Sequence, residues 1–265
     1  MTLHYHGTPI TARRVLLTLK GRHFCVSFAA PSDVEVCHQI GQSVMLDNGA
    51  FSVWKRGIEP DWRGYYAWTD EWLNVPSTWA VIPDVIVGDA EQNDMLIEQW
   101  PHGGRGSPVW HLHEPIDRLL RLVDEWPRVC FGSSGEYATV LSPSWRARVS
   151  VAFDEVSKRH KRMPWIHMLR GMNLVKFDWP FASVDSADVA RNHRSVAGAA
   201  LAMVNRWDAM QCGQKSDHLA WRNLAKKLKA TSSGASGRRR QRASGPGALR
   251  QRVASSVADA AEPPA

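Results

Sequence analysis

The chain has 265 residues, 44% of them hydrophobic, which is enough for the core of one domain of about 250 residues. No apolar run approaches the roughly 18 residues of a membrane span, and the first residues lack the pattern of a secretory signal, so we expect a cytoplasmic protein without a membrane partner. The formal net charge is +7, but ten Lys or Arg and only two acidic residues follow position 221, so residues 1–221 carry −1.

Eight segments begin with apolar residues and most end with polar ones, as strands buried on both faces do. In chain order they lie at residues 3–10, 24–28, 43–51, 80–89, 108–114, 129–136, 165–171 and 181–188. Helical spacing of apolar residues predicts helices at 115–126, 144–158 and 219–229, and an aromatic helix at 61–72. Alternation of strands and helices predicts an α/β fold with a parallel sheet.

The number of predicted strands favours a (β/α)8 TIM-like barrel over a doubly wound sheet, although the length suits both. No G-x-G-x-x-G or P-loop motif follows a strand, which argues against dinucleotide and nucleoside triphosphate binding. Residues 1–230 are therefore predicted to form the catalytic barrel. Residues 231–265 have too few apolar side chains to form a core and are predicted to be a disordered basic tail.

Acidic residues recur at or just after the predicted strand ends, where they would converge on one mouth of a barrel. They are Asp47, Asp84, Asp89, Glu114, Glu136, Asp185 and Asp188, and His111, His113 and His167 lie near them. Such a set permits metal-assisted hydrolysis, glycosyl transfer through a carboxylate nucleophile, or acid/base isomerisation, and the pattern alone does not choose between them.

Several of these residues have structural interpretations as well. Asp89 and Asp188 each precede a helix-like segment and are equally well explained as helix N-caps. His111 and His113 alternate on one strand, so they would either share a metal ion or form a hydrogen-bonded pair. The four cysteines are too scattered for C-x-x-C pairs, so neither disulfides nor a cysteine zinc site is expected.

Residues 43–52, SVMLDNGAFS, resemble the strand end Asp-Ser-Gly-Gly-Phe of tRNA-guanine transglycosylases and their relatives, which place 7-deazaguanine bases into tRNA or DNA. Asn48 and Ala50 replace the second and fourth residues of that motif. Further similar motifs follow in the family's order, at residues 83–89, 132–136, 167–171 and 183–186. The likeness covers roughly residues 20 to 195 and is greatest to the short phage- and prophage-type members that act on DNA. The C-terminal zinc ligands of the tRNA enzymes are missing, since only Cys212 lies in the last third.

The resemblance implies a base-exchanging pentosyltransferase that needs no cofactor. Asp185 would be the nucleophile at C1′, with Asp188 as the competing candidate, and Asp47 would manage the proton of the leaving and entering bases. Asp89, with Asp84 as the alternative, would accept hydrogen bonds from the guanine-like face. The other implied substrate-binding residues are Phe51, His113, Ser133, Ser134, Gly135, Glu136 and Leu169.

The expected partners are nucleic acid, with DNA favoured and tRNA as the alternative, and a 7-deazaguanine base. The nearly neutral body with its basic tail also leaves room for an accessory protein. Arg238, Arg239, Arg240 and Arg242 form a basic run in the tail that is suited to phosphate contacts. The alternative function is a metal-dependent TIM-barrel hydrolase that uses His111, His113 and the strand-end acids. A noncatalytic DNA-binding barrel is disfavoured, because converging carboxylates would repel phosphate.

Overall fold

The computed structural model describes residues 1–212. Its strands are β1 (Leu3–Gly7), β2 (His23–Ser27), β3 (Ser43–Asp47), β4 (Thr78–Val81), β5 (Gly106–Ser107), β6 (Val109–His111), β7 (Val129–Gly132), β8 (Ile166–Met168) and β9 (Ser183–Ser186). The predicted helix at 219–229, the tail at 231–265 and the four arginines Arg238, Arg239, Arg240 and Arg242 lie outside the described residues.

Helices follow most strands. They are α1 (Arg13–Leu17), α2 (Val34–Ile40), α3 (Ala50–Arg56), α4 (Trp62–Trp72), α5 (Ala90–Glu98), α6 (Ile116–Glu125), α7 (Pro143–Arg159), α8 (Asp188–Asn192) and α9 (Ala197–Asp208). Four short 3₁₀ helices complete this part of the chain, η1 (Pro31–Asp33), η2 (Gly103–Arg105), η3 (Gly135–Tyr137) and η4 (Met172–Lys176). No helix within residues 1–212 combines the length and the apolar character needed to cross a bilayer.

The strands form one parallel sheet in the order β5-β4-β3-β2-β1-β9-β8-β7-β6. Its two edge strands, β5 and β6, are separated only by Pro108, which cannot donate a ladder hydrogen bond. The carbonyl of Ser107 accepts from the amide of Ile82 at 3.0 Å, and the carbonyl of Pro108 accepts from the amide of Cys130 at 2.8 Å. The edges thus continue one another, and the sheet is a nearly closed barrel.

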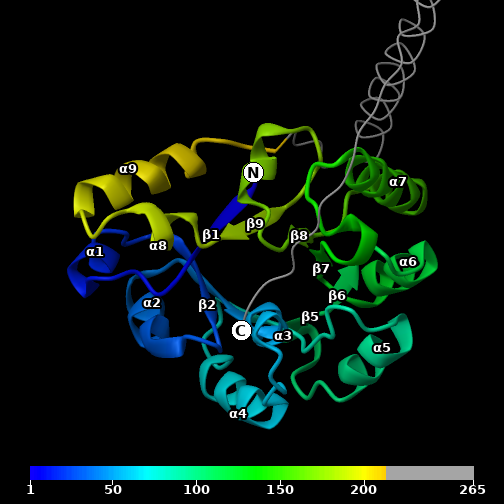
Figure 1. The fold of residues 1–265 in the computed structure, drawn as a ribbon, viewed down its shortest axis with the longest axis horizontal. Coiled ribbons are helices and arrows are strands. Elements are labelled where there is room, and N and C mark those ends of the chain that lie inside the picture. Colours follow the sequence, from blue (N-terminus) through cyan, green and yellow to red (C-terminus); the bar gives the residue numbers. More distant parts are fainter. Residues whose placement is uncertain (213–265) are drawn as a thin grey trace, which may run out of the picture. The chain divides into compact units, whose positions relative to one another are not determined.

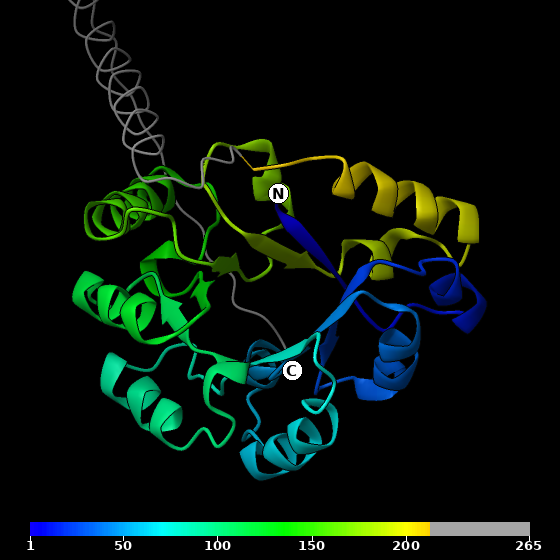
Figure 2. The same ribbon diagram turned by 180° about the vertical axis from the view of Figure 1, so that it is seen from behind.

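Helices surround this barrel in both views of the described chain (Figures 1 and 2). The prediction of a TIM-like α/β barrel is confirmed, including the strand expected within residues 3–10, which is β1. The predicted helices at 61–72, 115–126 and 144–158 correspond to α4, α6 and α7. The carboxyl ends of all strands therefore point to one end of the barrel, because every pairing is parallel.

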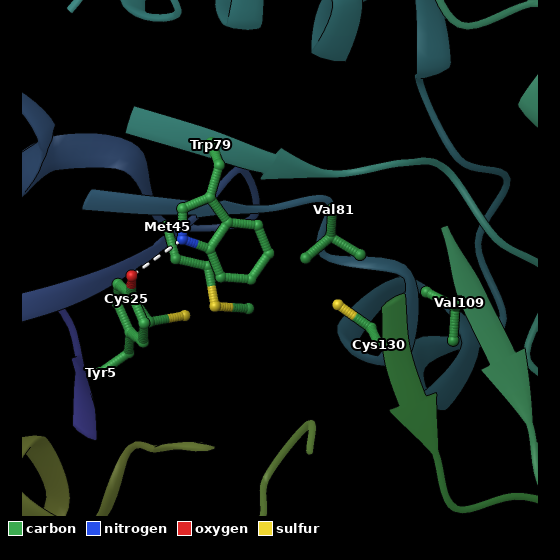
Figure 3. Packing of buried hydrophobic residues seen from close by; sticks show 7 residues of the cluster. All are labelled: Tyr5, Cys25, Met45, Trp79, Val81, Val109 and Cys130. Atoms are coloured by element: carbon green, nitrogen blue, oxygen red, sulfur yellow. Dashed lines mark hydrogen bonds between the residues drawn. The ribbon is translucent and has the colours of Figure 1, made fainter. Parts of the chain in front are cut away.

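The interior of the barrel is filled by side chains from alternate strand positions, as Figure 3 shows for seven of them. They are Tyr5, Cys25, Met45, Trp79, Val81, Val109 and Cys130. The indole N–H of Trp79 donates to the hydroxyl of Tyr5 at 2.9 Å, so the two polar atoms buried with these rings satisfy each other. This layer closes the barrel below its carboxyl end.

Candidate active site

A cavity of about 800 Å³ opens above this core layer, at the carboxyl ends of the strands. Side chains of a strand alternate, so the residues two positions beyond the core layer line it. Five of them are Gly7, Ser27, Asp47, His111 and Gly132. Three of these five are Gly or Ser, and their small size leaves the space that a larger side chain would fill.

Asp185 lies on β9 and borders this cavity with only 8% of its surface exposed. Its Oδ1 accepts hydrogen bonds from Nε2 of His167 at 3.2 Å and from the backbone N–H of Arg170 at 2.7 Å. Both bonds end on the same oxygen. Oδ2 accepts none within the described part of the chain, so this oxygen is available to a ligand.

The imidazole of His167 fixes the orientation of Asp185. Burial lowers the pKa of His167, although the neighbouring Asp185 opposes this, and the ring is therefore neutral at neutral pH. Its Nδ1 lies 2.8 Å from Oγ of Ser183, and that hydroxyl accepts from the indole N–H of Trp165 at 2.9 Å. Because Nε2 faces the carboxylate of Asp185, the single proton of the neutral ring lies on Nε2, and the Ser183 hydroxyl therefore donates to Nδ1.

Asp47 is the last residue of β3, and the turn that follows it depends on Gly49. Gly49 has φ +76°, a conformation that favours glycine, and its N–H donates to Oδ2 of Asp47 at 3.2 Å. The pKa of Asp47 is raised from 3.8 to about 6, mainly by burial and also by the charges of Asp185 and Asp84, while the nearby Ser27 hydroxyl and the Gly49 amide oppose the rise. A carboxyl group with this pKa exchanges protons readily near neutral pH.

Asp84 also lines the cavity and is 5% exposed. Its Oδ1 accepts from Nδ2 of Asn48 at 2.7 Å, and its Oδ2 accepts from Nε2 of His111 at 2.8 Å. Asn48 is itself fixed, because its Nδ2 donates to the carbonyl of Ile82 and its Oδ1 accepts from the amide of Ala50, both at 2.8 Å. Asp84 is thereby held rigidly in the cavity wall.

Cationic side chains complete the cavity. The guanidinium of Arg170 lies 3.8 Å from the ring centre of Phe51, and its charge is favoured by Asp185, Asp47 and Asp84 although burial lowers its pKa. Lys55, Arg56 and Arg191 also line the cavity, and all three are exposed. The cavity therefore combines carboxylates in its interior with cations at its solvent-exposed margin.

Two acids that were predicted to bind substrate, Asp89 and Glu136, lie outside the cavity. Asp89 is exposed and does not line the cavity, because it forms a capping box with Gln92 at the start of α5. This corrects the preference for Asp89 over Asp84: the N-cap interpretation explains Asp89, and Asp84 is the acid that reaches the cavity. Glu136 is exposed in η3 and also lies outside the cavity.

Asp188 and Glu114 have structural partners. Asp188 accepts from the indole of Trp207 and the amide of Asn192, both at 2.8 Å, and it does not line the cavity. Glu114 is buried and accepts from Arg118 at 2.6 Å and from the amide of His111 at 2.9 Å. These acids join helices to the barrel and are not presented to a ligand.

Of the remaining predicted substrate-binding residues, three line the cavity and three do not. Phe51, Ser133 and Leu169 line the cavity. His113, Ser134 and Gly135 do not, and the φ of +56° at Gly135 shows that this glycine serves the turn. His113 and Ser134 instead belong to a hydrogen-bonded cluster with His111.

Sequence reasoning gave no role to Asn48, Arg170 or the Ser183 hydroxyl. The departure at Asn48 from the family motif was visible in the sequence, and its amide is what holds Asp84. Arg170 has φ +57°, and no local pattern signals this conformation or its contact with Phe51. Ser183 and His167 are 16 residues apart and meet only because β8 and β9 pair in register.

A metal centre at His111 and His113 finds no support in the geometry. All four ring nitrogens lie within hydrogen-bond distance of Asp84, Ser134 or the carbonyl of Gly88. Within residues 1–212, His, Cys, Asp and Glu side chains do not form any group of three that could hold an ion. The two rings do not form a direct hydrogen-bonded pair either; each has a nitrogen within hydrogen-bond distance of the Ser134 hydroxyl, which joins them.

Searches among protein-family models, curated proteins and solved structures returned no match to this chain. The fold and the cavity define its class by themselves: a parallel α/β barrel of the TIM type with a cavity of carboxylates and cations at the carboxyl ends of its strands. In barrels of this class the carboxyl end is where active sites are found.

Proposed function

We propose that the protein is a base-exchanging glycosyltransferase that replaces guanine by a 7-deazaguanine derivative in nucleic acid, with DNA favoured over tRNA. The observation that carries the proposal is the pair of acids in one cavity with different environments. Asp185 is held by a neutral imidazole and an amide with one oxygen free, whereas the pKa of Asp47 is raised to about 6. These two environments suit a nucleophile at Asp185 and a proton carrier at Asp47.

In the first half of the reaction, Oδ2 of Asp185 attacks C1′ of the nucleotide and the bond from C1′ to the base nitrogen breaks. The electron pair of that bond goes to the base, which takes the proton of Asp47. The result is a glycosyl ester of Asp185 and a neutral free base. In the second half, ionised Asp47 removes the proton from the incoming base, whose nitrogen attacks C1′ and displaces the carboxylate of Asp185.

Base recognition falls to Asp84 in this proposal. Each oxygen of Asp84 already accepts one hydrogen bond, from Asn48 or His111, and each retains a second lone pair for the N–H donors of a guanine-like edge. Because both partners hold the carboxylate in place, it would meet the base in one orientation. The cavity volume of about 800 Å³ is within the usual range for small-ligand sites and accommodates a bicyclic base.

The assay that tests the proposal is transfer of a labelled base. Full-length protein is incubated with double-stranded DNA or with tRNA and with radiolabelled guanine or a 7-deazaguanine, and label is measured in the precipitated polymer. We expect incorporation into DNA that is insensitive to chelator. Release of products without incorporation, abolished by chelator, would instead support the metal-dependent hydrolase.

The cations at the cavity margin are expected to contact phosphate. The double variant Lys55→Ala/Arg56→Ala should bind DNA more weakly and lower the slope of log Kd against log salt by about 1 to 2. Gly57 ends α3 just beyond both residues, so the helix end itself is unchanged. The matched control is Lys158→Ala/Arg159→Ala on α7, whose side chains pair with acids on α6 and α7 away from the cavity. An unchanged slope in the first variant would contradict the prediction.

A further inference from the structure

Four side chains, two in the cavity wall and two behind it, form a continuous hydrogen-bonded chain. Nε2 of His113 lies 3.0 Å from the carbonyl oxygen of Gly88, and Nδ1 of His113 lies 2.8 Å from Oγ of Ser134. The same Oγ lies 3.1 Å from Nδ1 of His111, whose Nε2 lies 2.8 Å from Oδ2 of Asp84. One end of the chain is thus a carbonyl, which only accepts, and the other is a carboxylate in the cavity wall.

Each of the four contacts needs one hydrogen, because two bare lone pairs at these distances would repel each other. A neutral His113, a neutral His111 and the Ser134 hydroxyl supply one hydrogen each, and ionised Asp84 supplies none. The carbonyl of Gly88 requires the hydrogen of His113 on Nε2, so Ser134 must donate to His113. His111 must then donate to Ser134 from Nδ1, and the contact between His111 and Asp84 is left without a hydrogen.

A second hydrogen-bonded chain of side chains ends at Asp185 and provides a comparison within the same protein. Its three contacts join Trp165, Ser183, His167 and Asp185, and Trp165, Ser183 and neutral His167 supply the three hydrogens that they need. This second chain is complete with Asp185 ionised. Asp84 and Asp185 therefore lie at the ends of two hydrogen-bonded chains of side chains. The one that ends at Asp84 lacks one of the hydrogens that its contacts need.

We infer that the chain from His113 to Asp84 holds one additional proton at neutral pH, carried by His111 against Asp84, so that this pair has no net charge. The surrounding charges agree with that placement. Asp47, Asp185 and Arg170 border the same cavity, and Glu114, which accepts from the amide of His111, is already paired with Arg118. A proton on His111 therefore offsets the carboxylate that would otherwise add to Asp47 and Asp185.

The consequence concerns Asp47. The charge of Asp84 is one of the causes that raise the pKa of Asp47. A proton held at His111 limits this effect, so it lowers the pKa of Asp47 relative to a pair that carries the full charge of Asp84. His113 and Ser134 would thus be positioning residues that act on the proposed reaction through Asp47. This consequence rests on the proposed function, whereas the additional proton does not.

The test is the protonation state of the histidines by ¹⁵N nuclear magnetic resonance on full-length protein at pH 7.5. We expect one of the two rings, His111, to carry hydrogens on both nitrogens. In His113→Leu, Ser134 is free to donate to His111, so His111 should become neutral with its hydrogen on Nε2. Ser134→Ala removes the same link without touching either ring and is the second variant if His113→Leu does not fold. His160→Leu, at the end of α7, is the control and should leave His111 unchanged.

Two neutral rings together with an ionised Asp84 in the wild-type protein would overturn the inference. Loss of the proton on His111 should also raise the apparent pKa of the Asp47 carboxyl by about 1. The ¹³C chemical shift of this carboxyl, recorded as a function of pH, measures the change. In the base-transfer assay, His113→Leu should move the pH dependence of base release upward by a similar amount. If no transfer occurs in any variant but the ¹⁵N result holds, the proposed function fails and the additional proton stands.

Discussion

Asp185→Asn is expected to lower base exchange by a factor on the order of 10⁴ or more, since loss of a covalent nucleophile is among the most damaging changes that an enzyme can undergo. The amide has the same shape and still accepts from His167 and Arg170 through its oxygen, so the fold should be unaffected. The measurement is the initial rate of labelled-base incorporation. Trapping of a covalent complex with DNA under denaturing conditions should also be lost.

Asp188→Asn is the matched control for this experiment. Asp188 follows Asp185 by three residues and was the competing nucleophile on sequence grounds, yet its oxygens bind Trp207 and Asn192 away from the cavity. We expect this variant to keep its rate within about a factor of a few and to be slightly less stable, because the contact with α9 is weakened. The assignment fails if Asp188→Asn loses incorporation and Asp185→Asn retains it.

Asp47→Asn is expected to stop both halves of the base exchange and, at the same time, to stabilise the fold at pH 7.5 by about 3 kcal/mol. The wild-type cavity holds a carboxylate whose ionisation is opposed by burial and by Asp84 and Asp185. An amide does not carry this penalty. Activity and stability should therefore change in opposite directions at one residue.

The sign of the effect follows from the pKa of Asp47, which is raised from 3.8 to about 6. An acid with a raised pKa in the folded state binds its proton more tightly there, so its favourable contribution is fully present below about pH 3.8 and is lost as the pH rises through 6. The advantage of Asp47→Asn should thus be greatest above pH 7 and should vanish near pH 4. Denaturant unfolding at both pH values measures it.

Asp117→Asn, an exposed acid in the first turn of α6, serves as the comparison for a carboxyl group outside the cavity. It should show neither the stabilisation nor the loss of activity. A gain in stability for Asp47→Asn that is equal at pH 4 and pH 7.5 would show that burial of its charge is not the cause. A similar base-exchange rate in Asp47→Asn would remove Asp47 from the proposed mechanism.

Local sequence patterns were sufficient to predict the barrel architecture, because the strands and helix caps that they indicate depend on residues close in the sequence. The apolar residues before Asp47 form β3, and the Ser142-Pro143 start of α7 is capped by the Ser142 hydroxyl at the amide of Trp145. Where a local interpretation competed with a functional one, the local one explains Asp89, whose capping box is complete within four residues. The short strand β5 at residues 106–107 was not predicted, because the expected strand begins only at Pro108.

The sequence by itself determined the alternation of strands and helices and the acids that end several strands, because strand periodicity, turns and caps act over a few residues. Only the tertiary structure decided which acids share the cavity. Asp47, Asp84 and Asp185 meet there, while Glu114, Glu136 and Asp188 do not. The contact of His111 with Asp84 spans 27 residues and that of His167 with Asp185 spans 18, and the second follows from the register of β8 and β9. Burial, which raises the pKa of Asp47, likewise exists only once the barrel has formed.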